Sequence, residues 1–400
     1  MDVRSITPDE LEAFFTSFMR TMGFGPPPDA YFERERKTFQ YPRSIAAFDA
    51  GTIVGTTYSH LFDLTLPGGS QIAAAGVTAV SVSSTHRRRG IVTDLMRRQL
   101  LEATERGEPA AILIASEGRI YRRFGYGIAT QVADVRIEVR DARVEHRSHE
   151  GRVVIVDGGA ADKIFPAVHQ KMVKGRAGAL GRPQHFWESI TADRDKKTVN
   201  VVHENAAGEP DGYAIYDVKA DWNDGLPTHA LSLHALVGTN DAASFELWTY
   251  ILGIDLVREV KSFSRPVDEP LRWVLDEPRA VRSTSVRDMY WLRPLDIARV
   301  LGSRTYATET ELRLHVDDPL LGLGGTFVLR AGPDGAECER VDGGADLRLG
   351  ISELGSIALG GVTPTELHRA GRIEETTPGA VARTELGFAT SPRPWGDLYF

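Results

Sequence analysis

The sequence predicts an α/β chain in which mixed β-sheets carry helices on their faces. Residues 73–127 read as a strand, a basic turn, a helix and a second strand. Residues 231–253 repeat the order of strand, turn and helix, and a third set of strands and short helices follows from residue 295. Strands that alternate with helices in this way are typical of sheets covered by helices.

Length and composition bound the class of protein. A chain of 400 residues suggests two or three domains with ample core. No run of about 18 apolar residues is present, and the first residues lack the apolar segment of a signal peptide. The net charge of -8 argues against a general nucleic-acid binder and is compatible with cationic substrates.

The chain has a single cysteine, Cys338, so no intramolecular disulfide is expected and a reducing compartment such as the cytoplasm fits. Glu337 and Glu339 flank it, and adjacent negative charge disfavours a thiolate, so no nucleophilic role is predicted. The eleven histidines form no H-E-x-x-H motif and no paired Cys/His spacing. We therefore predict no metal site.

The first element is an amphipathic helix that ends at Gly23. Thr7 and Glu10 form a capping-box pattern, with Pro8 at the first helical position. The apolar residues that follow at helical spacing are Leu11, Phe14, Phe15, Phe18 and Met22. Phe32, Phe39 and Tyr41 come next and either belong to the core, which we favour, or line a substrate cleft.

Strands are then expected over residues 44–48 and 52–64, with turns at 49–51 and 67–69. They precede the basic turn. Residues 128–140 also show the alternation of a strand. The chain becomes polar near residue 145, where we expect the first domain to end.

The helix after the basic turn is expected from Ile91 to about Arg106, and Gly107 suits a left-handed cap at its end. It follows a buried strand over residues 77–82. Five apolar residues and one polar residue share one face of this helix: Val92, Leu95, Met96, Gln99, Leu100 and Ala103.

The turn itself, Arg87-Arg88-Arg89-Gly90, has the chemistry of an anion site. A strand that feeds a helix through this turn presents unpaired backbone N–H groups and a positive dipole end. Gly90 permits close approach, and the arginines suit phosphates. No lysine follows the glycine, so an NTPase P-loop is not expected. On the turn alone, a solvated helix start explains the residues equally well.

Together with the segment that follows, this turn resembles the GNAT family of acetyl-CoA-dependent N-acetyltransferases. The family's R-x-x-G-x-G/A turn appears as Arg87 to Val92, with Val92 where a small residue is usual. Its (F/Y)Y-x-x-(F/L)-G-(F/Y) element appears as Ile120 to Tyr126. THRRRG, ASEG-x-IY-x-RFGYG, SRPVDEPLRW and the chain end look like one branch, the enhanced intracellular survival (Eis) acetyltransferases.

The resemblance implies acetyl-CoA as co-substrate and direct acetyl transfer to an amine. It implies that Tyr121 is the general acid toward the leaving sulfur and that the α-carboxylate of Phe400 is the base. From the residues alone, Tyr121 is more simply a core aromatic. The residues implied to contact acetyl-CoA are Val80, Ser81, Val82, Arg87, Arg88, Arg89, Gly90, Ile91, Val92, Thr93, Ser116 and Glu117.

We expect a tandem of GNAT-like domains followed by a sterol-carrier-like domain. The ranges are 1–147 for the catalytic domain, 148–288 for a second GNAT-like domain without a cofactor site, and 289–400 for the sterol-carrier-like domain. The second turn, residues 238–243, has no arginine and no glycine to open the helix; an unrelated α/β domain is the alternative. Residues 289–294 are expected to close the second unit, and residues 322–325 to form a turn.

Two classes of function follow. The first is an N-acetyltransferase acting on aminoglycoside-like molecules, polyamines or protein lysines; the second is a non-catalytic lipid or ligand carrier that uses the third domain. The intact basic turn favours the enzyme. The Eis branch also implies a homo-oligomer, specifically a hexamer. The aromatic chain end, residues 395–400, predicts a docked C-terminus, because free tails are generally polar.

Overall fold

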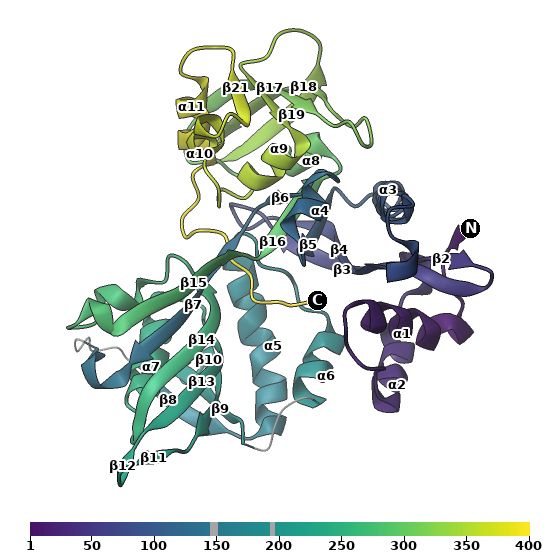
Figure 1. Cartoon of the computed structure of the whole chain (residues 1–400). Coiled ribbons are helices and arrows are strands. Elements are labelled where there is room, and N and C mark those ends of the chain that lie inside the picture. Colours follow the sequence, from purple (N-terminus) through teal and green to yellow (C-terminus); the bar gives the residue numbers. More distant parts are fainter. Residues whose placement is uncertain (145–150, 193–196) are drawn as a thin grey trace. The chain divides into compact units, whose positions relative to one another are not determined.

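A computed structural model describes residues 1–144, 151–192 and 197–400 of the chain. The chain divides into two compact units, drawn in Figure 1: the first comprises Met1–Thr130, Met289–Thr390 and Tyr399–Phe400, and the second comprises Gln131–Asp288 and Ser391–Leu398. The expected boundary at residue 147 lies outside the described residues. Among the described helices, none is long and apolar enough to cross a membrane.

The first unit contains a seven-stranded mixed sheet in the order β1-β2-β3-β4-β5-β16-β6. Its helices cover both faces: α1 and α2 pack on one face, and α3 packs on the other (Figure 1). The bounds are β1 (Asp2–Arg4), β2 (Ser44–Asp49), β3 (Thr52–Thr65), β4 (Gln71–Val82), β5 (Ala110–Ile114), β6 (Gly127–Ile128), β16 (Tyr290–Pro294), α1 (Leu11–Thr21), α2 (Asp29–Thr38), α3 (Ile91–Glu105) and α4 (Gly118–Arg122).

The predicted start of the first helix is confirmed. The Thr7–Glu10 capping box forms around a short 3-10 turn that leads into α1. The predicted apolar stripe is wrong only at its end. Met22 lies just past α1 and is 42% exposed, because the helix stops before its side chain can turn toward the sheet. Phe32 and Phe39 are buried, so they belong to the core.

The helix predicted after the basic turn is also confirmed. Its one polar face residue, Gln99, is buried, and its side-chain oxygen accepts a hydrogen bond of 2.6 Å from Thr57 Oγ1. Gly107 has a φ of 74° and ends the helix in the left-handed region. A buried amide with a hydrogen-bonding partner explains how a polar residue can occupy the inner face of α3.

The second unit contains another seven-stranded sheet, in the order β15-β7-β14-β13-β10-β9-β8. Its bounds are β7 (Gln131–Glu138), β8 (Gly151–Val156), β9 (Val199–Asn205), β10 (Pro210–Lys219), β13 (His229–Gly238), β14 (Val257–Pro266), β15 (Val281–Asp288), α5 (Gly158–Gly175), α6 (Gln184–Ala192) and α7 (Asp241–Leu252), with a small β11 (Trp222–Asn223) and β12 (Leu226–Pro227) hairpin. The strand, turn and helix predicted over residues 231–253 are β13 and α7.

The two sheets exchange a strand. In the first sheet β16 lies between β5 and β6, and in the second sheet β7 lies between β14 and β15. The expectation that residues 289–294 close the second unit is therefore wrong. The strand within residues 128–140, expected in the first domain, is β7 of the second sheet. All five residues of β16 are buried, so its sequence signals a central strand without saying which sheet receives it.

A third sheet, β19-β18-β17-β20-β21, belongs to the first unit. Its bounds are β17 (Thr310–Asp317), β18 (Gly325–Gly332), β19 (Gly335–Val341), β20 (Leu347–Gly350), β21 (Ile373–Glu375), α8 (Ile297–Gly302), α9 (Ile351–Ile357), α10 (Pro364–Arg369) and α11 (Ala380–Phe388). Residues 318–324 join β17 to β18, and the turn lies at residues 319–321, where the Gly322 N–H donates to the Asp318 carbonyl at 3.0 Å. The turn predicted at residues 322–325 is therefore placed too late, since Gly325 already begins β18.

A buried ion pair joins the first sheet to this third domain. Arg293 lies on β16, and its Nη2 donates to Asp318 Oδ1 and Oδ2 at 3.0 and 2.9 Å. Both side chains are fully buried. Asp318 begins the loop between β17 and β18, whose leucines pack into the core cluster that contains Tyr121. The pair therefore fixes this loop against the core of the first sheet.

Asp318→Ala should lower the free energy of unfolding by about 3–5 kcal/mol, because it leaves the Arg293 guanidinium buried without a counter-charge. Urea unfolding monitored by circular dichroism measures the loss. The matched control is the double variant Arg293→Met with Asp318→Leu, which removes both charges and should recover most of the stability. A single variant as stable as the wild type would contradict this role.

Candidate functional site

The basic turn opens α3 with unpaired donors. Arg88 and Gly90 both adopt positive φ, 62° and 81°, and α3 begins at the next residue, Ile91. In the described part of the chain, no protein atom accepts a hydrogen bond from the backbone N–H groups of residues 88–92. Of these residues, Gly90 is the N-cap of α3, and Ile91 and Val92 lie in its first turn, where the helix dipole is positive. The turn therefore presents a ready site for an anion.

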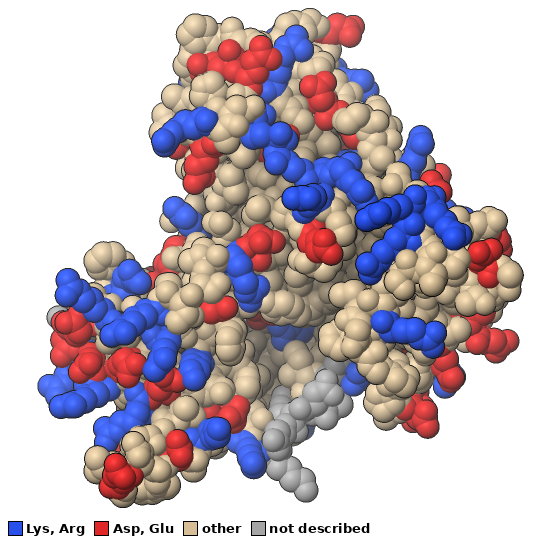
Figure 2. Space-filling view, in the orientation of Figure 1, with Lys and Arg blue, Asp and Glu red and all other residues tan. Residues whose placement is uncertain are grey.

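The charge around this turn matches that geometry. Arg87, Arg88 and Arg89 are all exposed. Figure 2 shows Lys and Arg side chains gathered over the part of the first unit that carries α3 and α4. His86 precedes the arginines, and its Nε2 lies 3.0 Å from Asp49 Oδ2, which ties the turn to the end of β2. Three exposed guanidinium groups beside N–H donors suit a pyrophosphate.

Next to the turn, β4 and β5 part. Their parallel ladder runs from the Ala74–Ala110 pair to the Val77–Leu113 pair and stops there, although β4 continues to Val82. In the described structure, no strand pairs with residues 78–82 on this side. We call this interruption the β4–β5 parting. An extended ligand can add to such an exposed strand edge through its backbone groups.

A bulge in β4 accompanies the parting. Ala79 has a φ of 52°, and the register with β3 shifts beside it. Thr56 Oγ1 donates to the Ala79 carbonyl at 2.7 Å and lies 2.7 Å from Ser81 Oγ, which holds the bulge from the β3 side. The bulge changes the direction in which the side chains of residues 80–82 point. Thr56 was not predicted as a functional residue, and nothing in its sequence context marks it.

Tyr121 lies on α4, beside the parting. Its side chain is 6% exposed and packs in a core cluster with Ala75 and Val77 of β4 and Met96 of α3. Burial raises the pKa of the phenol above its ordinary value of 10.0, and a hydrogen bond with Ser116 offsets part of this rise. The phenol therefore stays protonated near neutral pH, as a proton donor must.

The loop between β5 and α4 carries two further residues that the sequence singled out. Ser116 and Glu117 are both exposed, and Glu117 immediately precedes α4. Ser116 is the hydrogen-bonding partner of Tyr121. The structure thus brings the loop, Tyr121 and the β4 edge to the same end of the first sheet.

Phe400 docks on the other face of this sheet. Its ring centroid lies 4.9 Å from that of Phe62 on β3 and 6.1 Å from that of Tyr290 on β16. Gly76 makes room: a Cβ there would lie 2.2 Å from the Phe62 ring and 3.2 Å from the Phe400 ring. The prediction of a docked C-terminus is confirmed. A glycine within a strand is the sequence feature that could have predicted this close approach.

Alternation along the strands sets Tyr121 and Phe400 on opposite faces. Ala75 and Val77 face the Tyr121 cluster, so Gly76, which contacts Phe400, faces the other way. The last ladder pair before the parting involves Val77, the next residue. The two candidate catalytic groups therefore approach the interrupted part of the sheet from its two sides.

The corresponding place in the second unit is closed. The ladder between β13 and β14 also stops short, at Leu233, but Arg265 Nη1 donates to the Leu236 carbonyl at 2.8 Å beyond that point. Arg265 is 5% exposed and pairs with Glu269. At the start of α7, Asn240 caps the helix, its Oδ1 accepting from an N–H group of the first turn at 2.8 Å. In the second unit, one carbonyl beyond the ladder and one N–H group at the start of the helix are thus bonded by the protein's own side chains.

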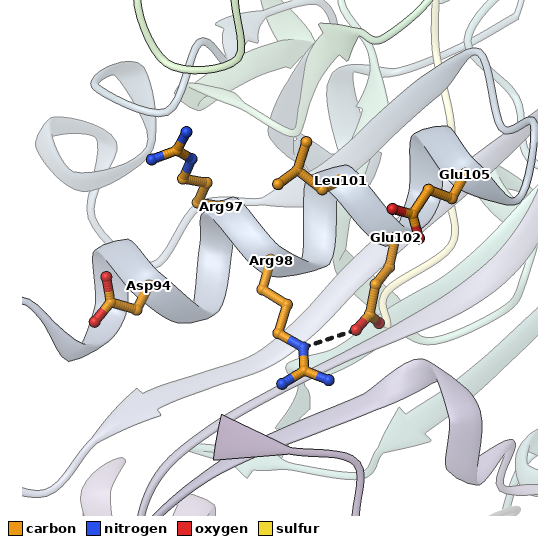
Figure 3. Close-up of a pocket in the computed structure, with 6 residues that line it drawn as sticks. All are labelled: Asp94, Arg97, Arg98, Leu101, Glu102 and Glu105. Carbon is orange, nitrogen blue, oxygen red and sulfur yellow. Dashed lines mark hydrogen bonds and ion pairs between the residues drawn. The ribbon is translucent and has the colours of Figure 1, made fainter. Parts of the chain in front are cut away.

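Other features of the first unit do not add to this site. Cys338 is half-buried, and burial together with the charges of Asp296 and Glu339 raises its pKa to about 12, so the thiol is a poor nucleophile. A shallow hollow beside α3 is lined by side chains of that helix (Figure 3). Arg98 there pairs with Glu102 and also donates to the Val3 carbonyl of β1.

Family comparisons agree with this geometry. An acetyltransferase (GNAT) domain model matches residues 2–129, a second acetyltransferase (GNAT) model matches residues 178–300, and a sterol carrier protein domain model matches residues 297–396. An uncharacterized N-acetyltransferase of Streptomyces griseus is 35% identical over 412 residues, which covers 99% of this chain and 98% of that protein.

The N-acetyltransferase Eis of Mycobacterium tuberculosis is 30% identical over 356 residues, covering 84% of this chain and 83% of that protein. The crystal structure of Eis1 from Mycobacterium abscessus superposes with a TM-score of 0.90 at 33% identity and covers all of both chains. The chain belongs to the Eis family of N-acetyltransferases. It is therefore a tandem GNAT enzyme with a sterol-carrier-like domain, and acetyl-CoA is its acetyl donor.

The Eis-family chain should bind one acetyl-CoA, because the site is open only in the first unit. Calorimetry should return one site per chain. Arg88→Ala with Arg89→Ala should weaken binding at least about tenfold, since a hydrogen bond to a charged group contributes roughly 1.5–3 kcal/mol.

The matched control is Arg97→Ala with Arg98→Ala, which removes the same charge from α3 (Figure 3) and should leave affinity within about twofold. Two sites per chain, or equal losses in both double variants, would refute the assignment.

Proposed function

We propose that this enzyme transfers the acetyl group of acetyl-CoA directly to the amine of an aminoglycoside-like molecule, a polyamine or a protein lysine. One observation carries the mechanism: a buried, protonated phenol and a docked chain terminus lie on the two faces of the sheet where β4 and β5 part. The net charge of -8 is compatible with a cationic acceptor.

We assign acetyl-CoA to the β4–β5 parting and the basic turn. The free edge of β4 at residues 80–82 would bond the amides of the pantetheine arm, as an added strand would. The N–H groups and side chains of residues 87–93 would hold the pyrophosphate. Ser116 and Glu117 would lie beside the pantetheine. The unpaired donors and the unpaired strand edge support this fit.

Bound acetyl-CoA supplies the reactive thioester; the chain supplies two proton transfers. Tyr121 would give its phenolic proton to the sulfur as the carbon–sulfur bond breaks. The raised pKa of Tyr121 keeps that proton in place at neutral pH. The phenolate that results would regain a proton from solvent, with Ser116 as the hydrogen-bonding partner that stabilises it.

The α-carboxylate of Phe400 would take the proton that the attacking amine loses. Its ordinary pKa of about 3.3–3.7 leaves it ionised at neutral pH but weakly basic, so its placement matters more than its strength. That placement is supported by an aromatic row on β3. Tyr58, His60 and Phe62 lie in ring contact along one face of β3, and the Phe400 ring continues the row.

Tyr121→Phe should lower kcat on the order of 10²–10⁴-fold and leave the affinity for acetyl-CoA unchanged, because it removes only the proton donor. In the wild type, kcat should not fall from loss of this acid as pH rises from about 7 to 9, since its pKa lies above 10.0.

Tyr126→Phe is the matched control: this tyrosine lies in the same cluster, its ring 6.3 Å from that of Tyr121, and its hydroxyl has no partner within the described structure. It should keep wild-type turnover. Full activity of Tyr121→Phe would leave Tyr121 as a core aromatic.

A short extension after Phe400 should abolish most turnover, on the order of 10²–10⁴-fold, because it converts the terminal carboxylate to a neutral amide. Deleting Phe400 should do the same, since the carboxylate moves back by roughly 3.3–3.6 Å of chain. Acetyl-CoA affinity and thermal unfolding should not change. An N-terminal extension of equal length is the control, and a C-terminally extended enzyme with the untagged rate would place the base elsewhere.

We further propose that the enzyme works in the cytoplasm as a homo-oligomer, a hexamer by its family resemblance. A single cysteine fits a reducing compartment. Light scattering at micromolar concentration should return a multiple of the chain mass of 44.0 kDa. A mass equal to one chain would contradict the oligomer.

A further inference from the structure

The last ten residues of the chain, which we call the C-terminal tail, have two points of attachment. Ser391–Leu398 belong to the second unit, and Tyr399–Phe400 belong to the first. Only Leu398 and Tyr399 separate Asp397, the last polar residue held by the second unit, from Phe400. How firmly Asp397 is held therefore governs how far the terminal carboxylate can move.

Two side chains, a histidine and an arginine, hold Asp397. His169 Nε2, from α5, lies 3.1 Å from Asp397 Oδ1, and Arg182 Nη2 donates to Asp397 Oδ2 at 3.2 Å. His169 is 1% exposed and Arg182 is 7% exposed, so solvent screens this arrangement little. We call these three residues the tail latch.

Trp187 on α6 contacts both His169 and Arg182 of the latch. The His169 ring meets it edge to face at 5.3 Å, and the Arg182 guanidinium lies 4.4 Å above its ring. A guanidinium stacked on an indole and a histidine wedged against the same ring have little freedom to follow a moving partner. The latch is thus a preorganised receptor for a carboxylate at position 397.

The tail upstream of the latch is tied at alternate residues. The Arg393 N–H donates to Asp268 Oδ2 at 2.6 Å, and the Trp395 N–H donates to the Ala177 carbonyl at 2.9 Å. Trp395 Nε1 also donates to the Ser264 carbonyl at 2.8 Å. Asp397 is the next residue in this alternating series, and it is held by its side-chain carboxylate instead of by its backbone. The latch is the final attachment before the chain reaches Phe400.

Asp397 is itself unsuited to be the base. Burial works to raise the pKa of its carboxyl, but the charges of His169 and Arg182 outweigh that effect and hold the pKa below its ordinary value. Both of its oxygens are engaged by the latch. Its carboxylate therefore serves attachment and has little tendency to take a proton.

We propose that His169 and Arg182, acting through Asp397, are positioning residues for acetyl transfer that hold the C-terminal carboxylate in its working place. This inference rests on the proposed role of Phe400 as the base. From Asp397 to Phe400 the chain spans at most about 10–11 Å. A base must lie within roughly 2.6–3.2 Å of the proton it takes, and a displacement of about 1 Å can cost on the order of 10²-fold in rate.

The test compares Asp397→Asn, Arg182→Gln and the double variant with the wild type in two assays. Carboxypeptidase Y digestion, followed by intact-mass spectrometry, measures the rate at which Phe400 is released. Steady-state kinetics separate kcat from the KM for acetyl-CoA. Each single variant should release Phe400 at least about tenfold faster and lose at least about tenfold in kcat at unchanged KM. The double variant should be no worse than the more severe single variant, because both remove one interaction.

Asp211→Asn is the matched control. Asp211 Oδ1 lies 2.5 Å from His203 Nδ1, so this change also removes a carboxylate held by a buried histidine of the second unit. Within the described structure Asp211 makes no hydrogen bond or ion pair with the tail, so this change should alter neither the release of Phe400 nor kcat. If the control matches Asp397→Asn in both assays, the effect is one of general stability and the proposal is overturned.

The outcomes separate the latch from the base. Unchanged release of Phe400 in the latch variants overturns the latch, whatever their activity. Faster release with wild-type kcat overturns the positioning role. The Phe400-deleted enzyme then tests the base assignment separately: if it is inactive, Phe400 remains the proposed base, and if it is active, that assignment is wrong. Faster release with a lower kcat and unchanged KM supports the proposal.

Discussion

The interruption of the β4–β5 ladder is the constraint on which the rest of the site depends. Four residue pairs join the two strands, and then β4 continues for five residues with no strand beside it. The backbone groups along this edge have no strand partner within the described structure, so an extended ligand can complete it. The basic turn and the free N–H groups of α3 lie at the end of that same strand. In the proposed binding mode, acetyl-CoA would supply both the amides for this edge and the anion for the turn.

In the second unit, which has the same architecture, side chains of the protein itself bond the corresponding backbone groups. Its sheet repeats the strand order of the first, and its helix α7 corresponds to α3. There Arg265 reaches the strand that would otherwise be open, and Asn240 caps the helix. The Arg265 guanidinium, which pairs with Glu269, thus satisfies the Leu236 carbonyl from within the chain. This difference in hydrogen bonding is the basis on which we propose that only the first unit binds acetyl-CoA.

Much of the architecture could be predicted from the sequence, because it rests on local patterns. The capping box at Thr7, the apolar face of α3 and the glycine at residue 107 each fix an element through neighbouring residues. The aromatic chain end predicted a docked terminus, although only the structure shows that Phe400 packs against Phe62. The sequence motifs and the order of the elements likewise predicted where the basic turn and Tyr121 lie in the fold.

What escaped prediction depends on contacts distant in sequence. The residues of β16 and β7 read as buried strands, but strand character does not reveal which sheet receives a strand. The role of Arg265 could not be predicted because its acceptor, the Leu236 carbonyl, is a backbone atom with no sequence signature. The hydrogen bond from Thr56 to the Ala79 carbonyl could not be predicted for the same reason.

The central claim is that acetyl transfer takes place at the β4–β5 parting, with Tyr121 at one face. A crystal structure of the enzyme with bound CoA tests this most directly. We predict that the pantetheine amides bond the backbone of Val80 to Val82 and that the CoA sulfur lies within hydrogen-bonding distance of Tyr121 Oη. Pantetheine bound away from the β4 edge, or a sulfur out of reach of Tyr121, would contradict it.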